Sequence, residues 1–102
     1  MSELDKLENY LKEHNITYDR VEKPRKLFED SEVHQIIVYE KEERVWDAIC
    51  HPGSFGYNEG LLEVMGEPVV KPSDGDSVCG YLTAEDVIAR YEEYKKNGRW
   101  VE

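Results

Sequence analysis

The sequence predicts an α+β fold, in which an N-terminal and a C-terminal helix pack on one face of an antiparallel sheet of three or four strands. Helical periodicity with capping residues occurs at the two ends of the chain, whereas short β-branched or alternating runs separated by polar turns fill its middle. A chain of 102 residues buries one modest core, and no repeat or linker divides it. Residues 1–102 are therefore expected to form a single domain.

The N-terminal helix is predicted over about residues 3–14. Ser2 can cap the free N–H groups of its first turn, and Asp5 stands where the second residue of a capping box belongs. Three leucines then recur at the spacing of one helical face, which predicts the buried stripe of this helix: Leu4, Leu7 and Leu11.

The middle of the chain contains four predicted strands and a brief extended segment, at residues 16–21, 35–39, 44–50, 61–65 and 77–81 respectively. A turn around Pro24 and a loop at residues 25–32 separate the first two strands. Residues 67–77, with two prolines and an Asp-Gly-Asp turn, are expected to form a mobile loop.

Two of these strands carry a burial signal. Residues 35–39 are continuously apolar, which predicts burial on both faces of the sheet. Residues 44–50 follow a polar turn and alternate, so that Trp46, Ala48 and Cys50 share one face. A helix is the alternative for residues 44–50, because alanine and aspartate are poor strand formers.

The C-terminal helix is predicted to begin after Thr83, which can cap it, and two acidic residues in its first turn favour the positive end of the helix dipole. Val87, Ile88 and Tyr91 form its apolar stripe. Gly98 is a typical C-terminal stop.

The formal net charge of −10, from 23 acidic and 13 basic residues, constrains the partners of the protein. It disfavours direct binding to nucleic acid or to an anionic membrane, because both would repel the chain. It fits either an ordinary solvated acidic surface or a protein partner with a basic surface. A more specific hypothesis is a nucleic-acid mimic that occupies the groove of a basic protein and inhibits it.

The location of the protein is predicted from its N-terminus and its cysteines. The first residues are acidic and amphipathic rather than typical of a signal peptide, and the apolar runs are too short to span a membrane. A cytoplasmic location is therefore expected, with Cys50 and Cys79 as free thiols.

Cys50 and His51 are the first candidates for catalysis, because a thiolate nucleophile needs a neighbouring base or positive charge. Adjacent strand residues point to opposite faces, so His34, across the predicted hairpin, is the better candidate partner for Cys50. A Cys/His-dependent enzyme is thus a second possible function. The cysteines and histidines lack the paired spacing of zinc sites, so neither a metal nor another cofactor is expected.

The glycine-rich loop at residues 52–60 is the predicted binding site. It is neither a nucleophile elbow nor a phosphate loop, since its serine directly follows a glycine and no Gly-Lys-Ser/Thr follows. It does carry two aromatic residues, which are enriched at protein contacts. The predicted contact residues are Phe55, Tyr57, Asn58 and Glu59. We therefore expect a non-enzymatic protein-binding module, either a monomer or a homodimer formed through a sheet edge or this loop.

Three motifs of the sequence resemble those of known proteins. They are WDAICHPGSFGY and LLEVMG, between Val45 and Gly66, and GYLTAEDVI, from Gly80 onwards. Together with the amphipathic N-terminal helix, they resemble small uncharacterised proteins of Firmicutes bacteria and their mobile elements, over about two thirds of the chain. The resemblance implies a cytoplasmic bacterial protein of phage or conjugative-element origin. It implies no activity, substrate or catalytic residue.

Overall fold

The computed structural model describes residues 1–23 and 32–100, so Pro24 and nearly all of the predicted loop at residues 25–32 lie outside the described residues. The class is α+β, as predicted. The helices are α1 (Glu3–Glu13) and α2 (Ala84–Asn97), and short 3₁₀ turns occur at Tyr57–Glu59 and Pro72–Asp74. The strands are β1 (Tyr18–Lys23), β2 (Val33–Glu40), β3 (Glu43–Ile49), β4 (Leu62–Met65) and β5 (Val78–Leu82).

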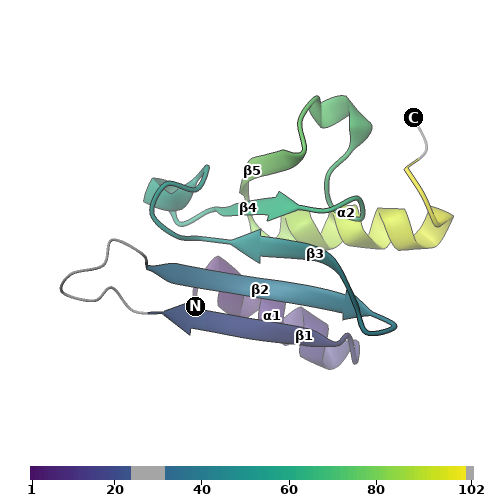
Figure 1. Ribbon diagram of the computed structural model, residues 1–102, viewed down its shortest axis with the longest axis horizontal. Helices are drawn as coiled ribbons and strands as arrows, with labels where there is room; N and C mark the ends of the chain where they lie inside the picture. Colours follow the sequence, from purple (N-terminus) through teal and green to yellow (C-terminus); the bar gives the residue numbers. More distant parts are fainter. Residues whose placement is uncertain (24–31, 101–102) are drawn as a thin grey trace.

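The strands of the described residues form one five-stranded sheet in the order β1-β2-β3-β4-β5, with every neighbouring pair antiparallel (Figure 1). The prediction of three or four strands was therefore wrong. The segment expected to be only briefly extended, residues 77–81, pairs with β4 and becomes a full edge strand. The strand predicted for residues 44–50 is confirmed over Glu43–Ile49 and the helical alternative is excluded, since this run pairs with strands on both sides.

Both helices lie behind the sheet in Figure 1 and cover the same face of it. Within residues 1–23 and 32–100, the core between the two layers contains fourteen buried apolar residues, contributed by both helices, by strands β2 to β5 and by Val69. The three leucines predicted for the N-terminal helix are among them, as are Trp46 and Ala48. Cys50, at the end of the same alternation, is only half-buried.

The opposite face of the sheet is not covered by either of these helices, and this corrects the prediction of burial on both faces for residues 35–39. Ile36 and Val38 face the helices and are fully buried, whereas Ile37 and Tyr39 point the other way and are half-buried. Asp47 is buried on this open face because Gln35 donates a hydrogen bond to it at 2.8 Å and Arg44 forms an ion pair with it at 3.1 Å.

The ends of the two helices follow the predicted capping. Ser2 and Asp5 form a capping box on α1, and Thr83 and Asp86 form one on α2. The helices are also joined to each other, because Glu3 accepts a hydrogen bond of 2.8 Å from the backbone N–H of Ala84. The first turn of one helix is therefore anchored on the first turn of the other.

Residues 67–77 are attached to the rest of the fold at several points, including Val69 and Asp74. Val69 is fully buried in the core. Arg90 of α2 donates to the carbonyl of Val69 at 3.0 Å and forms an ion pair of 2.7 Å with Asp74.

Among the described residues, no helix is long and apolar enough to span a bilayer.

Gly66, directly after β4, allows the chain to approach the central strand closely. Its φ is +121°, and a Cβ at this position would lie 2.6 Å from both the Cβ of Trp46 and the carbonyl oxygen of Val45. A side chain here would therefore meet backbone that cannot move without displacing the largest core residue.

We predict that Gly66→Ala destabilises the protein by more than about 3 kcal/mol, because backbone strain and a steric clash act together. Gly60→Ala is the matched control: Gly60 also has positive φ (+71°), but no atom lies within 4 Å of an added Cβ. Its cost should be about 1 kcal/mol, from strain alone. Urea denaturation of both variants tests this, and equal losses would contradict the role of the close approach.

Candidate functional site

The glycine-rich loop between β3 and β4 is a tightly hydrogen-bonded structure. Ser54 donates through its hydroxyl to the carbonyl of His51 at 2.7 Å and accepts from the backbone N–H of His51 at 3.1 Å. Leu61 N–H then returns to the carbonyl of Gly56 at 2.9 Å. The serine is therefore engaged in closing the turn, and the loop holds its aromatic residues in defined positions.

Phe55 is held against the edge strand β5 through backbone bonds. Its N–H donates to a carboxylate oxygen of Glu63 at 2.9 Å, and its carbonyl accepts from the N–H of Tyr81 at 3.2 Å. Gly80 makes this approach possible, because a Cβ there would lie 2.2 Å from the Cβ of Phe55. The register of β4 and β5 shifts between Leu62 and Val64, opposite this contact.

This arrangement brings two residues with exposed aromatic rings together through a backbone bond. Phe55 is 54% exposed and Tyr81 is 60% exposed. Met65, on the same face of β4 as Glu63, is 51% exposed. We call Phe55 and Tyr81 the aromatic patch.

Tyr81 has a φ of +59°, a left-handed conformation that is rare for a residue with an aromatic side chain. Such a conformation costs about 1–2 kcal/mol relative to an ordinary strand conformation. Strained backbone of this kind is concentrated at functional sites, where the surrounding structure enforces it. The irregular register of β4 and β5 and the bond to Phe55 hold Tyr81 in this conformation.

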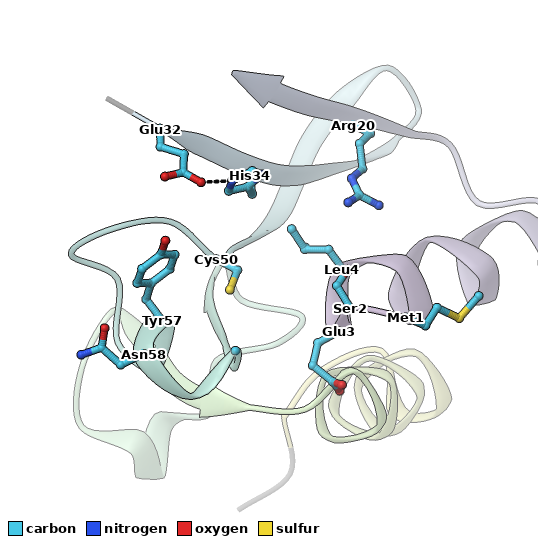
Figure 2. Close-up of a pocket in the computed structure, with 11 residues that line it drawn as sticks. Met1, Ser2, Glu3, Leu4, Arg20, Glu32, His34, Cys50, Tyr57 and Asn58 are labelled. Atoms are coloured by element: carbon cyan, nitrogen blue, oxygen red, sulfur yellow. Dashed lines mark hydrogen bonds and ion pairs between the residues drawn. The ribbon is translucent and has the colours of Figure 1, made fainter. Parts of the chain in front are cut away.

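The structure divides the four predicted contact residues between two surfaces. Phe55 lies on the side of β5, with the aromatic patch. Asn58 and Glu59 are exposed on the 3₁₀ turn, and Tyr57 is half-buried. Tyr57 and Asn58 line a pocket on the other side of the loop (Figure 2).

That pocket has a volume of about 670 Å³ and lies between the loop, the N-terminus of α1 and the strands β1 and β2 (Figure 2). Leu4 and Cys50 contribute apolar surface, and Arg20 and His34 contribute charge. The remaining lining residues are Met1, Ser2, Glu3, Glu32, Tyr57, Asn58 and Gly60.

A continuous ion-pair network lies beside the pocket on the side of β1, and three of its members line the pocket: Arg20, Glu32 and His34. Arg20 contacts Asp5 at 2.9 Å and Glu8 at 3.1 Å on α1, and Glu22 on its own strand at 2.6 Å. Glu22 also contacts Nδ1 of His34, whose Nε2 lies 2.6 Å from Glu32. We call these six residues the rim network: Asp5, Glu8, Arg20, Glu22, Glu32 and His34.

The rim network favours the protonated form of His34. Ionised carboxylates only accept hydrogen bonds, so a ring with a carboxylate at each nitrogen donates from both when it is protonated. Accordingly, the hydrogen bonds to Glu32 and then Glu22 raise the pKa of His34 above its ordinary value of 6.5. Protonation of His34 puts an imidazolium beside the guanidinium of Arg20 in the lining of the pocket.

Cys50 and His34 come together as predicted, yet they do not form a catalytic pair. The N–H of Cys50 donates to the carbonyl of His34 at 2.9 Å, and both side chains line the pocket. The ring nitrogens of His34 are both engaged with carboxylates, and burial raises the pKa of the Cys50 thiol. A thiol activated for nucleophilic attack needs the opposite shift.

Two further possibilities concern a metal centre and a nucleic-acid mimic. No group of three or more histidine, cysteine or acidic side chains is arranged to hold a metal ion within residues 1–23 and 32–100. Some of the described carboxylates are paired with arginine or lysine, as in Asp74 with Arg90 and Glu3 with Lys6. A nucleic-acid mimic would instead present unpaired negative charges in a regular row.

Sequence reasoning missed Tyr81, Met65 and the rim network. No local pattern indicated Tyr81, because its exposure depends on a register shift between β4 and β5. The rim network depends on the pairing of Arg20 with Ile36 and of Glu22 with His34 across two strands. The sequence shows that Arg20 and Glu22 alternate on one strand, but it does not show which residues of β2 lie opposite them.

We predict that the rim network makes stability depend on pH above neutrality. Because the pKa of His34 is raised in the folded state, its ion pairs contribute fully below about pH 6.5 and are lost as the pH rises through the folded-state pKa. The advantage of the wild type over His34→Gln in free energy of unfolding should therefore shrink between about pH 6 and pH 9.

Urea denaturation at several pH values measures this difference, with His14→Gln as the control. The ring of His14 contacts the carbonyl of Tyr10 instead of two carboxylates. The same pH dependence for both variants would contradict the role assigned to the rim network.

Comparison of the chain with protein-family models, with curated proteins and with solved structures found no match. The resemblance to small Firmicutes proteins thus rests on the sequence motifs alone, and function is inferred from the geometry of the loop, the aromatic patch and the pocket.

Proposed function

We propose that the protein is a non-catalytic protein-binding module that uses the aromatic patch as its contact surface. The observation that carries this proposal is the pair of exposed rings, Phe55 and Tyr81, joined through the backbone bond between them. Monomeric proteins rarely display several large apolar side chains at one place unless the place is used for contact. Tyrosine and phenylalanine also supply large contact areas.

The rigidity of the patch supports the same proposal. Phe55 is anchored at both its N–H and its carbonyl, and Gly80 packs directly beneath it. A surface already held in its binding conformation loses less entropy when a partner docks. The strain energy of the left-handed Tyr81 backbone is already present in the free protein, so binding does not add it.

The proposed partner is a protein with an apolar centre and basic residues around it. The chain carries a net charge of −10, and Glu63 and Glu59 lie on the segments next to Phe55. Opposite charge on the partner would accelerate association and make it sensitive to salt. The same charge opposes self-association, so we propose a monomer in the free state.

The proposal includes a cytoplasmic location. Cys50 and Cys79 are both free, as is usual in a reducing compartment. Neither is required for the proposed contact.

Two substitutions test the aromatic patch. Phe55→Ala removes one ring, and Tyr81→Gly removes the other while relieving its positive φ. Each should weaken partner binding about tenfold, equivalent to about 1.4 kcal/mol. Tyr81→Gly should leave the free energy of unfolding within about 1 kcal/mol of the wild type, because relief of strain offsets the greater freedom of glycine in the unfolded chain. The control is Lys96→Ala, an exposed change on α2.

The measurement has two stages. Immobilised wild-type protein captures partners from an extract of its host, and mass spectrometry identifies those absent from the Phe55→Ala sample. Biolayer interferometry with the purified partner then gives Kd for each variant. Equal affinity of the wild type, Phe55→Ala and Tyr81→Gly for the captured protein would refute the proposal.

A further inference from the structure

The two edges of the sheet differ in how they are protected against pairing with another chain. An edge strand exposes backbone N–H and C=O groups, and natural proteins usually guard such edges with charged side chains. β1 is guarded in this way, since four of its six residues are charged: Asp19, Arg20, Glu22 and Lys23. β5, which forms the upper edge of the sheet in Figure 1, has no charged residue among its five. It is therefore the less protected edge.

The first half of β5 has backbone groups with no backbone partner in the described part of the chain. The ladder with β4 uses only one side of this edge strand. Apart from that ladder, the backbone of residues 78–80 forms no hydrogen bond with another backbone group of the described residues. The second half is occupied, because the N–H of Tyr81 donates to the carbonyl of Phe55 at 3.2 Å. An added strand would therefore pair with the first half of β5.

The surroundings of this edge define the chemistry of the segment that fits it. The exposed rings of Phe55 and Tyr81 lie where the free part of the strand ends. Exposed carboxylates stand on both sides of β5 in the sequence, Asp76 before it and Glu85 after it. Neither of them forms an ion pair with a described residue. An uncharged segment with basic residues at its ends complements this arrangement.

We propose that the partner contributes a short extended segment that adds to the free edge of β5 as a further strand. The inference rests on the proposed function, since the segment belongs to the protein that contacts the aromatic patch. Backbone hydrogen bonds to β5 orient the segment, and its side chains contact Phe55 and Tyr81 where the free run ends. A second copy of this chain fits the edge less well, because two chains with a net charge of −10 repel each other.

The experiment uses short overlapping synthetic peptides of the partner that the immobilised wild type captures. The peptide that binds most tightly is resynthesised with a single backbone N-methyl group at each position in turn. Each N-methyl group removes one N–H donor. In a strand added to β5 it should therefore weaken binding about tenfold at alternate positions and much less at the positions between them. Losses without this alternation would overturn the proposal.

Val78→Lys places a charge on the free edge and should weaken partner binding about tenfold. Val21→Lys is the matched control, since Val21 is also a half-buried valine of an edge strand but belongs to β1. Urea denaturation of both variants separates a loss of affinity from a loss of folding. Equal affinity of the two folded variants for the partner would overturn the proposal.

Hydrogen exchange of the intact complex needs no variant. Strand addition should slow the exchange of amides within residues 78–80 and leave those of β1 unchanged. Unchanged exchange at residues 78–80 in a complex that still forms would overturn the proposal. Dimerisation of the free protein that slows the same amides would assign the edge to a second copy and would also overturn it.

The outcome is separate from that of the aromatic patch. Weaker binding by Phe55→Ala, with no alternation among the N-methyl peptides, removes the added strand alone. Alternation among the peptides, with wild-type affinity of Phe55→Ala and Tyr81→Gly, removes the aromatic patch alone.

Discussion

The contact between Trp46 and Tyr91 determines how the two layers of this protein fit together. Their ring centroids lie 5.2 Å apart, and both side chains are almost fully buried. Trp46 belongs to the central strand β3, and Tyr91 belongs to α2, whose position it sets on the sheet. Tyr91 also donates to Glu40 at 2.8 Å, which ties the helix to the β2–β3 hairpin. Because both helices use this face, the other face depends on polar contacts such as those of Asp47 with Gln35 and Arg44.

The glycine-rich loop shows how one segment can serve two surfaces. Gly56, with φ of +100°, lies between Phe55 and Tyr57 and lets the chain reverse its direction within a single residue. Phe55 consequently faces β5, while Tyr57 faces the N-terminus of α1. The glycines are thus needed for shape, and the shape determines which surface each aromatic residue joins. A sequence with the same composition but a displaced glycine would not separate the two rings.

Local chemistry made much of the fold predictable from sequence. The capping box of α1, the Thr83 cap of α2, the leucine stripe of α1 and the alternation of β3 depend on neighbouring residues, and each was correctly predicted. The fifth strand was not, because Val78–Leu82 becomes a strand only by pairing with β4. The exposure of Phe55 could be proposed from the sequence. Its proximity to Tyr81 could not, because it also depends on how β5 pairs with β4. The pocket brings together three segments that are distant in sequence, and nothing local indicated that.

The hydrogen bond from Ala84 to Glu3 joins positions that are 81 residues apart. During synthesis on the ribosome, α1 emerges well before the helix that completes its packing. Its leucines therefore stay incompletely covered until α2 has been made, and a chain interrupted before α2 presents them to chaperones and proteases. An incomplete copy is thereby distinguished from a finished one by the exposure of its own first helix.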